Sequence, residues 1–413
     1  MIKIAVDATP IRHKLSGIGM YALNLIQALH KLQGQEDFQL SVAYQPSVRQ
    51  WLSRDWSFLE VLTRHLEIKD LEIKTIPLPV TISSLLATIP NPILPYCEQY
   101  LGNPDIVHGT DHVVYPCRKS LRVMTIHDLT FIKYPQYVNS IVKSYTARVK
   151  QCLRWTDLVI TVSQSTKQDI VNYLGVNPDN IQVIPQASRY STLDLQNTLD
   201  LPDTKVESLL TSVNYDFAQP YILFVSTLEP RKNINTLISA FNYLKQRHQI
   251  EHQLVLIGQK GWSYESIFAA IASSPWKHHI HHLGYLSDQL VAWFYSNADV
   301  FVYPSYYEGF GLPVLEAMTL GAPVITSNTS SLPEVAGDAA ILIDPNQPIE
   351  LADAMVKVIS NAQLREELIR KGKERAMLFS WERTARETLA AYRFLVGKGK
   401  GGKVVEGTSF VDH

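Results

Sequence analysis

Residues 299–318 read DVFVYPSYYEGFGLPVLEAM, and they combine a short apolar run, a glycine-containing loop and the start of a helical pattern. An apolar run of this length, here at 300–303, is typical of a buried strand. Gly309 and Gly311 allow the backbone to approach a ligand closely, and Pro313 is expected at the first position of a helix. The loop therefore leads into a helix N-terminus, where free N–H groups and the helix dipole attract an anion such as phosphate.

Two carboxylates flank this predicted phosphate loop. Glu308 directly precedes it, and Glu316 lies about one turn into the predicted helix. Carboxylate oxygens accept hydrogen bonds from sugar hydroxyls. The stretch therefore predicts a diphosphate pocket with a hydroxyl-binding group on each side.

Short apolar runs of the same kind recur along the chain and alternate with helical patterns. The runs are residues 2–6, 40–43, 106–108, 123–126, 158–162, 181–184, 222–225, 254–257, 300–303, 323–326 and 340–343. The helical patterns include residues 18–32, 233–245, 288–296 and 381–395. This alternation indicates an α/β fold with parallel sheets.

A polar segment interrupts the alternation once, at 189–219. We therefore expect two doubly wound domains with a cleft between them, and ligands at the carboxyl ends of the strands. The expected divisions are an N-terminal domain over 1–190, a linker over 191–219, a C-terminal domain over 220–380, a final helix over 381–396 and a disordered tail over 397–413.

Composition excludes several classes of protein. The chain has 413 residues, of which 46% are hydrophobic and 19% charged, so it is folded rather than disordered. Its net charge of −1 gives no support to nucleic-acid binding. Cys97, Cys117 and Cys152 fit no zinc motif. With no targeting segment in the sequence, we expect a cytoplasmic protein.

Two further segments invite a ligand or membrane interpretation. Residues 277–282 carry four histidines but no carboxylate or cysteine, so we prefer a surface strand edge to a metal site. The stretch from Thr75 to Cys97 has no charge and five prolines, and it cannot span a bilayer as a helix. It either docks an acceptor or a membrane surface peripherally, or packs as an ordinary part of the N-terminal domain.

Three other segments follow predicted strands. In residues 224–233, FVSTLEPRKN, Arg231 and Lys232 are placed to neutralise a diphosphate, although such pairs are more often simply solvated. Gly17 and Gly19 open the first helix but follow the strand too late for a dinucleotide fingerprint, which disfavours a nicotinamide enzyme. His127 ends a strand, where a ligand-facing and a structural histidine are equally compatible with the sequence.

Taken together, these segments resemble the retaining glycosyltransferases of family 4, which have the GT-B fold. The resemblance rests on Glu308 and Glu316 with the seven residues GFGLPVL between them, on the Gly17/Gly19 loop, on His127, on PRKN at 230–233 and on LGYLS at 283–287. It covers about residues 1–396. It implies two Rossmann-like domains facing across a cleft, with the helix near Trp381 crossing back to an acceptor-binding N-terminal domain.

The resemblance also implies roles for individual residues. Glu308 would hold hydroxyls of the donor sugar, Glu316 the ribose, and Arg231 and Lys232 the diphosphate. Gly17 and Gly19 would close over the phosphates, and His127 would lie beside the donor sugar. The remaining donor-binding positions would be Thr227, Tyr285, Leu286, Gly309, Phe310, Gly311 and Leu312, with the backbone around Tyr285 and Leu286 reading the base.

The resemblance finally implies a reaction without metal or other cofactor. Many relatives carry an arginine where Thr227 stands, so Arg231 is expected to do more of the phosphate binding. The motifs EPRKN at 229–233 and HDLTF at 127–131 are most similar to those of mannosyltransferases of surface polysaccharide or glycolipid assembly. This similarity favours GDP-mannose as the donor and a glycan or lipid-linked acceptor. A UDP-sugar-dependent enzyme of the same family, a non-catalytic GT-B protein that binds a glycan or partner, and a GT-B epimerase remain alternatives.

Overall fold

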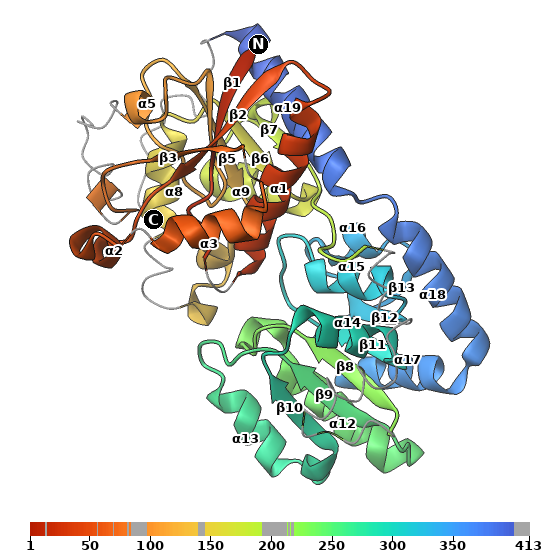
Figure 1. Ribbon diagram of the computed structural model, residues 1–413. Coiled ribbons are helices and arrows are strands. Elements are labelled where there is room, and N and C mark those ends of the chain that lie inside the picture. Colours follow the sequence, from red (N-terminus) through yellow and green to blue (C-terminus); the bar gives the residue numbers. More distant parts are fainter. Residues whose placement is uncertain are drawn as a thin grey trace. The chain divides into compact units, whose positions relative to one another are not determined.

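The computed structural model describes residues 1–12, 15–55, 57–68, 70–80, 82–83, 97–138, 145–191, 213, 215 and 219–399. The chain forms two compact units (Figure 1). The first comprises Met1–Lys133, Ser140–Gln186 and Ser380–His413, and the second comprises Tyr134–Asn139 and Ala187–Phe379. Each unit has its own parallel sheet and its own core.

The first unit contains a seven-stranded parallel sheet in the order β3-β2-β1-β4-β5-β6-β7. Its strands are β1 (Ile2–Asp7), β2 (Phe38–Tyr44), β3 (Glu72–Thr75), β4 (Ile106–Gly109), β5 (Leu121–Ile126), β6 (Leu158–Thr161) and β7 (Ile181–Val183). Because β2 and β4 lie on opposite sides of β1, the strand order reverses between β1 and β4. Such a reversal opens a crevice at the carboxyl ends of the strands.

Helices surround this sheet. They are α1 (Gly17–Gln33), α2 (Val48–Ser53), α3 (Ser57–Leu66), α5 (Cys97–Tyr100), α6 (Thr130–Lys133), α8 (Tyr145–Leu153), α9 (Gln164–Leu174), the 3₁₀ helix η2 (Pro178–Asn180) and α19 (Trp381–Lys398). Ser16 caps α1 by accepting a hydrogen bond from the Gly19 N–H at 3.1 Å. Gly175, in the left-handed conformation, ends α9.

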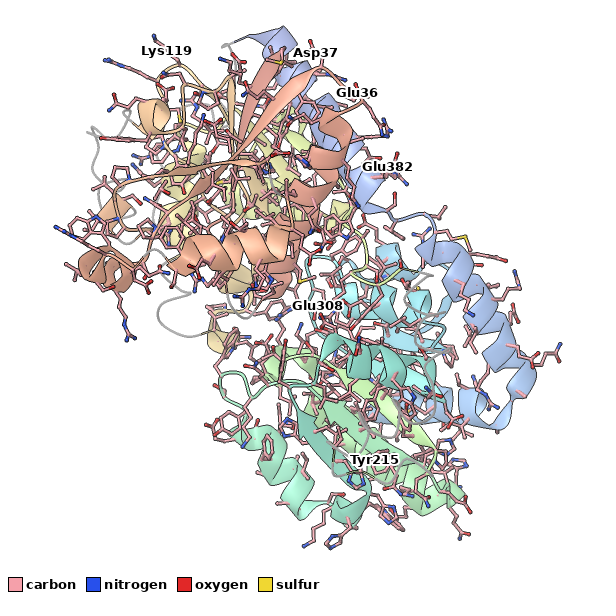
Figure 2. The ribbon with its side chains drawn as sticks, in the orientation of Figure 1. Glu36, Asp37, Lys119, Tyr215, Glu308 and Glu382 are labelled. Carbon is pink, nitrogen blue, oxygen red and sulfur yellow. The ribbon has the colours of Figure 1, made fainter. Side chains whose placement is uncertain are left out.

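The last helix of the chain belongs to the first unit. In Figure 1, α19 runs beside α1, and the two helices pack against each other. The Tyr392 hydroxyl lies 2.6 Å from Nδ1 of the buried His108. On the surface, Arg386 bonds to Glu382 at 2.9 Å and reaches Glu36 at 3.5 Å (Figure 2). The predicted return of the final helix to the N-terminal domain is thus confirmed.

The second unit contains a six-stranded parallel sheet in the order β10-β9-β8-β11-β12-β13. Its strands are β8 (Tyr221–Val225), β9 (Gln253–Ile257), β10 (Ile280–Gly284), β11 (Val300–Tyr303), β12 (Val324–Ser327) and β13 (Ala340–Ile343). The helices are η1 (Pro135–Tyr137), η3 (Pro230–Lys232), α12 (Ile234–His248), α13 (Glu265–Ser273), η4 (Lys277–His279), α14 (Asp288–Ser296), α15 (Leu312–Thr319), α16 (Leu332–Ala336), α17 (Pro348–Ser360) and α18 (Ala362–Ala376). Here the strand order reverses between β8 and β11.

The structure confirms the α/β fold and all eleven strands expected from the apolar runs. It adds β3, whose sequence EIKT alternates charged and apolar residues at the edge of the first sheet. The histidine-rich run forms η4 and the edge strand β10. Pro313 lies at the start of a helix as expected, as the second residue of α15, which begins at Leu312.

Three expectations fall mainly outside the described residues: the docking segment from Thr75 to Cys97, the linker at 191–219 and the tail at 397–413. The final helix extends to Lys398, two residues beyond its expected end. In the part of the chain that the structure describes, no helix has the length and apolar character needed to cross a membrane.

Candidate functional site

In the second unit, the two loops at the reversal of strand order come together. One follows β8 and contains Arg231 and Lys232, and the other follows β11 and contains Glu308. Because β8 and β11 are neighbours in a parallel sheet, their carboxyl ends meet at the same edge. Asn233 fastens the first loop to the second, since its Nδ2 donates to Pro304 O at 3.0 Å.

Glu308 is the centre of this site, and only 7% of its surface is exposed (Figure 2). Its Oε1 accepts hydrogen bonds from Lys232 Nζ at 2.6 Å, Ser305 Oγ at 2.7 Å and the Tyr303 hydroxyl at 2.9 Å. Its Oε2 lies 3.0 Å from Arg231 Nη1. From the sequence we expected Glu308 to bind sugar hydroxyls and Arg231 and Lys232 to bind the diphosphate. The structure shows that the three side chains also pair with one another in one ion cluster.

A second carboxylate completes the cluster. Arg231 Nη2 donates to Glu229 Oε1 at 2.8 Å, and its Nη1 donates to Tyr307 O at 2.5 Å. Glu229, Lys232 and Glu308 are buried, so their charges are poorly screened by solvent. Two cations and two anions balance, as buried charges generally require.

The charges shift one another's ionisation. Burial by itself would raise the pKa of Glu308, but Arg231 and Lys232 outweigh it and lower the pKa to about 2. The pKa of Lys232 is lowered, first by its burial and then by the neighbouring Arg231. Glu308 is therefore ionised throughout the physiological pH range.

The residues just before α16 hold the backbone of Glu308 and of the phosphate loop from the other side. The Glu308 N–H donates to Ser330 Oγ at 3.0 Å, and the Ser331 hydroxyl lies 2.9 Å from Glu308 O and 2.7 Å from Phe310 O. Gly311, the N-cap of α15, has φ of 113°, and a Cβ there would lie 2.8 Å from a side-chain carbon of Leu332. Glycine is thus required at this position.

Glu316 has a cationic partner that the sequence analysis missed. Its side chain is 5% exposed, and its Oε1 lies 3.0 Å from Nε of Arg189, which also contacts Asp288 at 2.9 Å. Burial raises the pKa of Glu316, while Arg189 opposes that effect. Arg189 belongs to the segment interpreted as the start of a polar linker, so no local sequence signal marked it.

The other predicted donor-binding positions of this unit lie in loops. Thr227 follows β8, and its side chain faces Gly261, where a Cβ would lie 2.8 Å from Thr227 Cγ2. Tyr285 and Leu286 follow β10, and the Tyr285 side chain is 61% exposed. The roles of these residues remain predictions.

Gly17, Gly19 and His127 belong to the first unit. Gly17 and Gly19 lie in the first turn of α1 rather than in a free loop, and a Cβ on Gly19 would lie 2.8 Å from Pro10 O. His127 follows β5 and is nearly buried, with its ring 4.7 Å from that of Tyr21.

The hydrogen bonds of His127 define its chemistry. Its Nε2 lies 2.8 Å from Thr110 O, and because a carbonyl only accepts, Nε2 carries the proton. Burial and the nearby His112 lower the pKa of His127 to about 4. The ring is therefore neutral near pH 7, and its Nδ1 is a hydrogen-bond acceptor.

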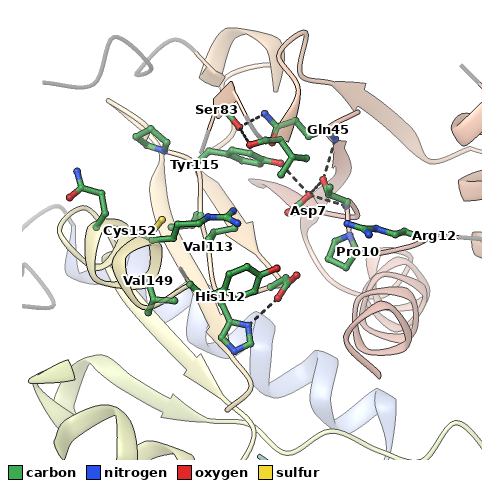
Figure 3. Close-up of a pocket in the computed structure, with 18 residues that line it drawn as sticks. Asp7, Pro10, Arg12, Gln45, Ser83, His112, Val113, Tyr115, Val149 and Cys152 are labelled. Carbon is green, nitrogen blue, oxygen red and sulfur yellow. Dashed lines mark hydrogen bonds and ion pairs between the residues drawn. The ribbon is translucent and has the colours of Figure 1, made fainter. Parts of the chain in front are cut away.

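The first unit also has a pocket at its own reversal of strand order, between the ends of β1 and β4. Asp7, Arg12 and Gln45 line it from β1, β2 and the loops that follow them, and α8 contributes Arg148 (Figure 3). Burial raises the pKa of Asp7 to about 6. His127 does not line this pocket, but its neighbour His112 does.

No three potential metal ligands cluster in the described part of the chain. In the histidine-rich run, His281 Nε2 lies 3.1 Å from Gln253 Oε1, and His282 Nε2 lies 2.9 Å from Gly258 O. These contacts support the interpretation of the run as a strand edge.

Comparison with known proteins decides the family. The family model described as Glycosyltransferase Family 4 matches residues 15–187, and the model described as Glycosyl transferases group 1 matches residues 213–375. The chain belongs to the family 4 glycosyltransferases. The predicted family and its GT-B fold are thereby confirmed.

Relatives and solved structures agree with this assignment. The glycosyltransferase is 29% identical to the O-antigen chain mannosyltransferase B of Escherichia coli, over 95% of this chain and 100% of that protein. A glycosyltransferase from Rickettsia africae has the same fold, with a TM-score of 0.69, 17% identity and coverage of 96% of this chain and 98% of that one. Anabaena HepE, solved with UDP and glucose, gives a TM-score of 0.68 at 17% identity and covers 95% of this chain and 100% of its own.

Proposed function

We propose that this glycosyltransferase transfers mannose from GDP-mannose to a glycan or lipid-linked acceptor, with retention of anomeric configuration and without a metal ion. The observation that carries the proposal is the ion cluster of Arg231, Lys232 and Glu308 at the carboxyl ends of β8 and β11. Cations at this position suit a diphosphate leaving group. The mannosyl donor is supported by the full-length similarity to a mannosyltransferase.

In this proposal Arg231 and Lys232 bind the donor diphosphate. As the bond between sugar and diphosphate breaks, negative charge grows on the departing phosphate oxygens. Cations that are already fixed in a buried site stabilise this charge without reorganising. The start of α15 at Leu312 adds the partial positive charge of the helix dipole.

Glu308 has two tasks in the proposal. It holds Lys232 and Arg231 in place before the donor binds, and its ionised carboxylate accepts hydrogen bonds from hydroxyls of the donor sugar. Ser305 and Tyr303 keep one of its oxygens oriented. Because the pKa of Glu308 is lowered, its two carboxylate oxygens stay unprotonated and can accept these hydrogen bonds.

The remaining assignments follow the same chemistry. We assign Glu316, oriented by Arg189, to the two ribose hydroxyls, because a carboxylate accepts two such bonds. We assign Nδ1 of the neutral His127 to a hydroxyl of the donor sugar. A departing phosphate oxygen takes the proton of the acceptor hydroxyl, so no further protein base is needed. A cytoplasmic location, with peripheral membrane contact through residues 75–97, is part of the proposal.

A thermal-shift panel tests the donor assignment. The full chain is heated with GDP, UDP, ADP or NAD, each with and without EDTA. A nucleotide at about 100 times its Kd adds about 2.7 kcal/mol to the free energy of unfolding. We expect GDP alone to stabilise, equally with and without EDTA.

The other outcomes separate the alternatives. Stabilisation by UDP instead of GDP would indicate a UDP-sugar donor. A shift that EDTA abolishes would indicate that a metal ion takes part in nucleotide binding. No response to any nucleotide would favour a non-catalytic glycan-binding protein. Incubation with GDP-mannose and an acceptor, followed by NMR of the product, then reads the anomeric configuration; turnover without an acceptor would indicate an epimerase.

A further inference from the structure

The pocket of the first unit differs from the ion cluster of the second because its two arginines have no carboxylate partner among the residues that the structure describes. Arg12 and Arg148 both line it, and in the described part of the chain neither guanidinium has a carboxylate within ion-pair distance. Arg148 lies over the ring of Tyr145, 5.2 Å from its centroid. In Figure 3, Arg12 enters the pocket from the side of β1, opposite to Val149 and Cys152 of α8.

The acidic residues of the pocket form no ion pair with these arginines in the part of the chain that the structure describes. Asp111 already has a cation, because its Oδ1 lies 3.0 Å from Nδ1 of His112, whose Nε2 lies 3.1 Å from Asp128 O. A carboxylate and a carbonyl both accept, so the doubly protonated imidazolium satisfies both bonds. The other carboxylate, Asp7, is buried in the wall of the pocket. Arg12, Arg148 and His112 against Asp7 and Asp111 leave one positive charge in excess.

Asp7 offers a site for a hydroxyl beside these cations. Its Oδ1 accepts hydrogen bonds from the Thr9 N–H at 2.9 Å, from the Thr9 hydroxyl at 2.5 Å and from the Tyr115 hydroxyl at 3.3 Å. Oδ2 receives no hydrogen bond from any residue that the structure describes. Apolar side chains supply a wall for the carbon face of a sugar ring: Pro10, Val80, Val113, Val114 and Val149.

We propose that this pocket binds a sugar that carries a negatively charged group, with Arg12 and Arg148 on the charge and Asp7 Oδ2 on a hydroxyl. The group is a phosphate ester or a carboxylate, since a guanidinium binds either oxyanion with two parallel hydrogen bonds. The inference rests on the proposed function, because it names the chemical class of the acceptor. The proposed acceptor is therefore a phosphorylated or acidic sugar and not a neutral one.

Direct binding to the full chain tests the proposal without any need for turnover. Calorimetric titrations compare methyl α-mannoside, mannose 6-phosphate, glucuronic acid and inorganic phosphate. We expect at least one charged sugar to bind ten times more tightly than the neutral glycoside, and its affinity to fall as salt rises. Mannose 6-phosphate and glucuronic acid distinguish the phosphate from the carboxylate, and inorganic phosphate measures the contribution of the anion alone.

Single variants identify the groups responsible. Arg12→Gln and Arg148→Gln should each weaken binding of the charged sugar about tenfold and leave the neutral glycoside unchanged. Arg154→Gln, an exposed residue just beyond α8 that does not line the pocket, is the matched control and should change neither. Asp7→Asn should weaken the charged and neutral sugars by the same factor, since it acts on a hydroxyl.

The proposal is overturned if the neutral glycoside binds as tightly as both charged sugars, if no charged sugar binds, or if the arginine variants weaken all ligands equally. Thermal shifts with GDP and UDP on the same variants provide the separate control. An unchanged nucleotide shift together with a negative sugar titration would reject the charged acceptor and leave the transferase function standing. Loss of the nucleotide response in the unsubstituted chain would reject the function itself.

Discussion

Both units have charged residues at the point where the strand order of their sheet reverses, but they differ in whether these charges form ion pairs. In the second unit, at the reversal between β8 and β11, Arg231, Lys232, Glu229 and Glu308 are paired within a few ångströms. In the first unit, at the reversal between β1 and β4, a pocket remains, and its two arginines form no ion pair with any residue that the structure describes. The strand order determines where chemistry can occur, and the pairing of charges determines what kind of ligand is accepted.

The two carboxylates at these positions show the difference most clearly. Both are buried, yet the pKa of Glu308 is lowered to about 2 and the pKa of Asp7 is raised to about 6. Burial acts in the same direction on both, and only Glu308 has cations close enough to overcome it. In the second unit the cations are thus fixed by carboxylates before a ligand binds. In the pocket of the first unit the two arginines lack such carboxylates among the described residues, so they can pair with a charged ligand instead.

The largest expected effect comes from breaking the paired site. In Lys232→Met, Glu308 loses its 2.6 Å ion-pair partner and the proposed site loses a cation for the diphosphate. We expect kcat to fall by about 10²–10³ and the free energy of unfolding to fall by about 3 kcal/mol, because a buried charge is left with fewer partners. Steady-state kinetics and urea unfolding measure the two losses.

Lys277→Met is the control for this variant, because Lys277 is an exposed lysine of the same unit. It should change neither quantity. If Lys232→Met kept its activity while losing stability, the cluster would be structural and the diphosphate would have to be bound elsewhere.

The next effect sharpens the comparison through pH. Because the pKa of Glu308 is lower in the folded state than in the unfolded chain, its contribution to stability is complete above about pH 5 and is lost as the pH falls towards 2. For Asp7 the folded pKa is the higher one, so its relative contribution is complete below about pH 4 and is lost as the pH rises through 6. The two carboxylates therefore affect stability in opposite senses.

Urea unfolding of Glu308→Gln and Asp7→Asn at pH 3, 5 and 7.5 measures this difference. With each pKa unit equivalent to about 1.4 kcal/mol, Asp7→Asn should gain about 3 kcal/mol over the unsubstituted protein between pH 3 and 7.5. Glu308→Gln should lose about 2 kcal/mol relative to the unsubstituted protein over the same range, because the rest of the loss lies below pH 3. Glu366→Gln, at an exposed position, should show neither trend, and parallel trends for the two carboxylates would contradict the comparison.

Much of this comparison could be predicted from the sequence, because the fold depends on local patterns. Buried parallel strands are short apolar runs, and every predicted run forms a strand. Two strands lie outside these runs: β10, in the histidine-rich run that was expected at a strand edge, and β3. The edge strand β3 lacks the apolar signal because its Glu72 and Lys74 remain partly exposed. Motif residues such as Glu308 and Lys232 were likewise recognisable from their place after strands.

Pairing between distant residues could not be predicted in the same way. Arg189 contacts Glu316, 127 positions later in the chain, and it lies in a segment that reads as a polar linker. The pocket of the first unit combines Asp7 and Arg12, at and just after the end of β1, with Arg148 of α8, which lies 136 positions after Arg12. No spacing rule connects such residues, because the sheet alone brings them together.

A smaller effect is expected at this overlooked arginine. Arg189→Met removes the cation that orients Glu316 and opposes the increase in its pKa. We expect KM for the nucleotide-sugar donor to rise about tenfold with little change in kcat, since the ribose is remote from the bond that breaks. Arg370→Met, which breaks only an exposed ion pair with Glu374, should leave KM unchanged. A fall in kcat with constant KM would contradict the ribose assignment.

The smallest expected effect concerns the base of the nucleotide. Tyr285 is one of the most exposed large side chains of the described chain, and the prediction is that backbone atoms at 285 and 286, rather than this ring, contact the base. Tyr285→Ala should therefore change the Kd of GDP by less than about threefold, because stacking of a base on an aromatic ring would contribute about 1–3 kcal/mol and a larger loss. Calorimetric titration of GDP measures the change. A loss of tenfold or more would show that the ring stacks on the base, and the second unit would then recognise its donor partly through an exposed aromatic side chain.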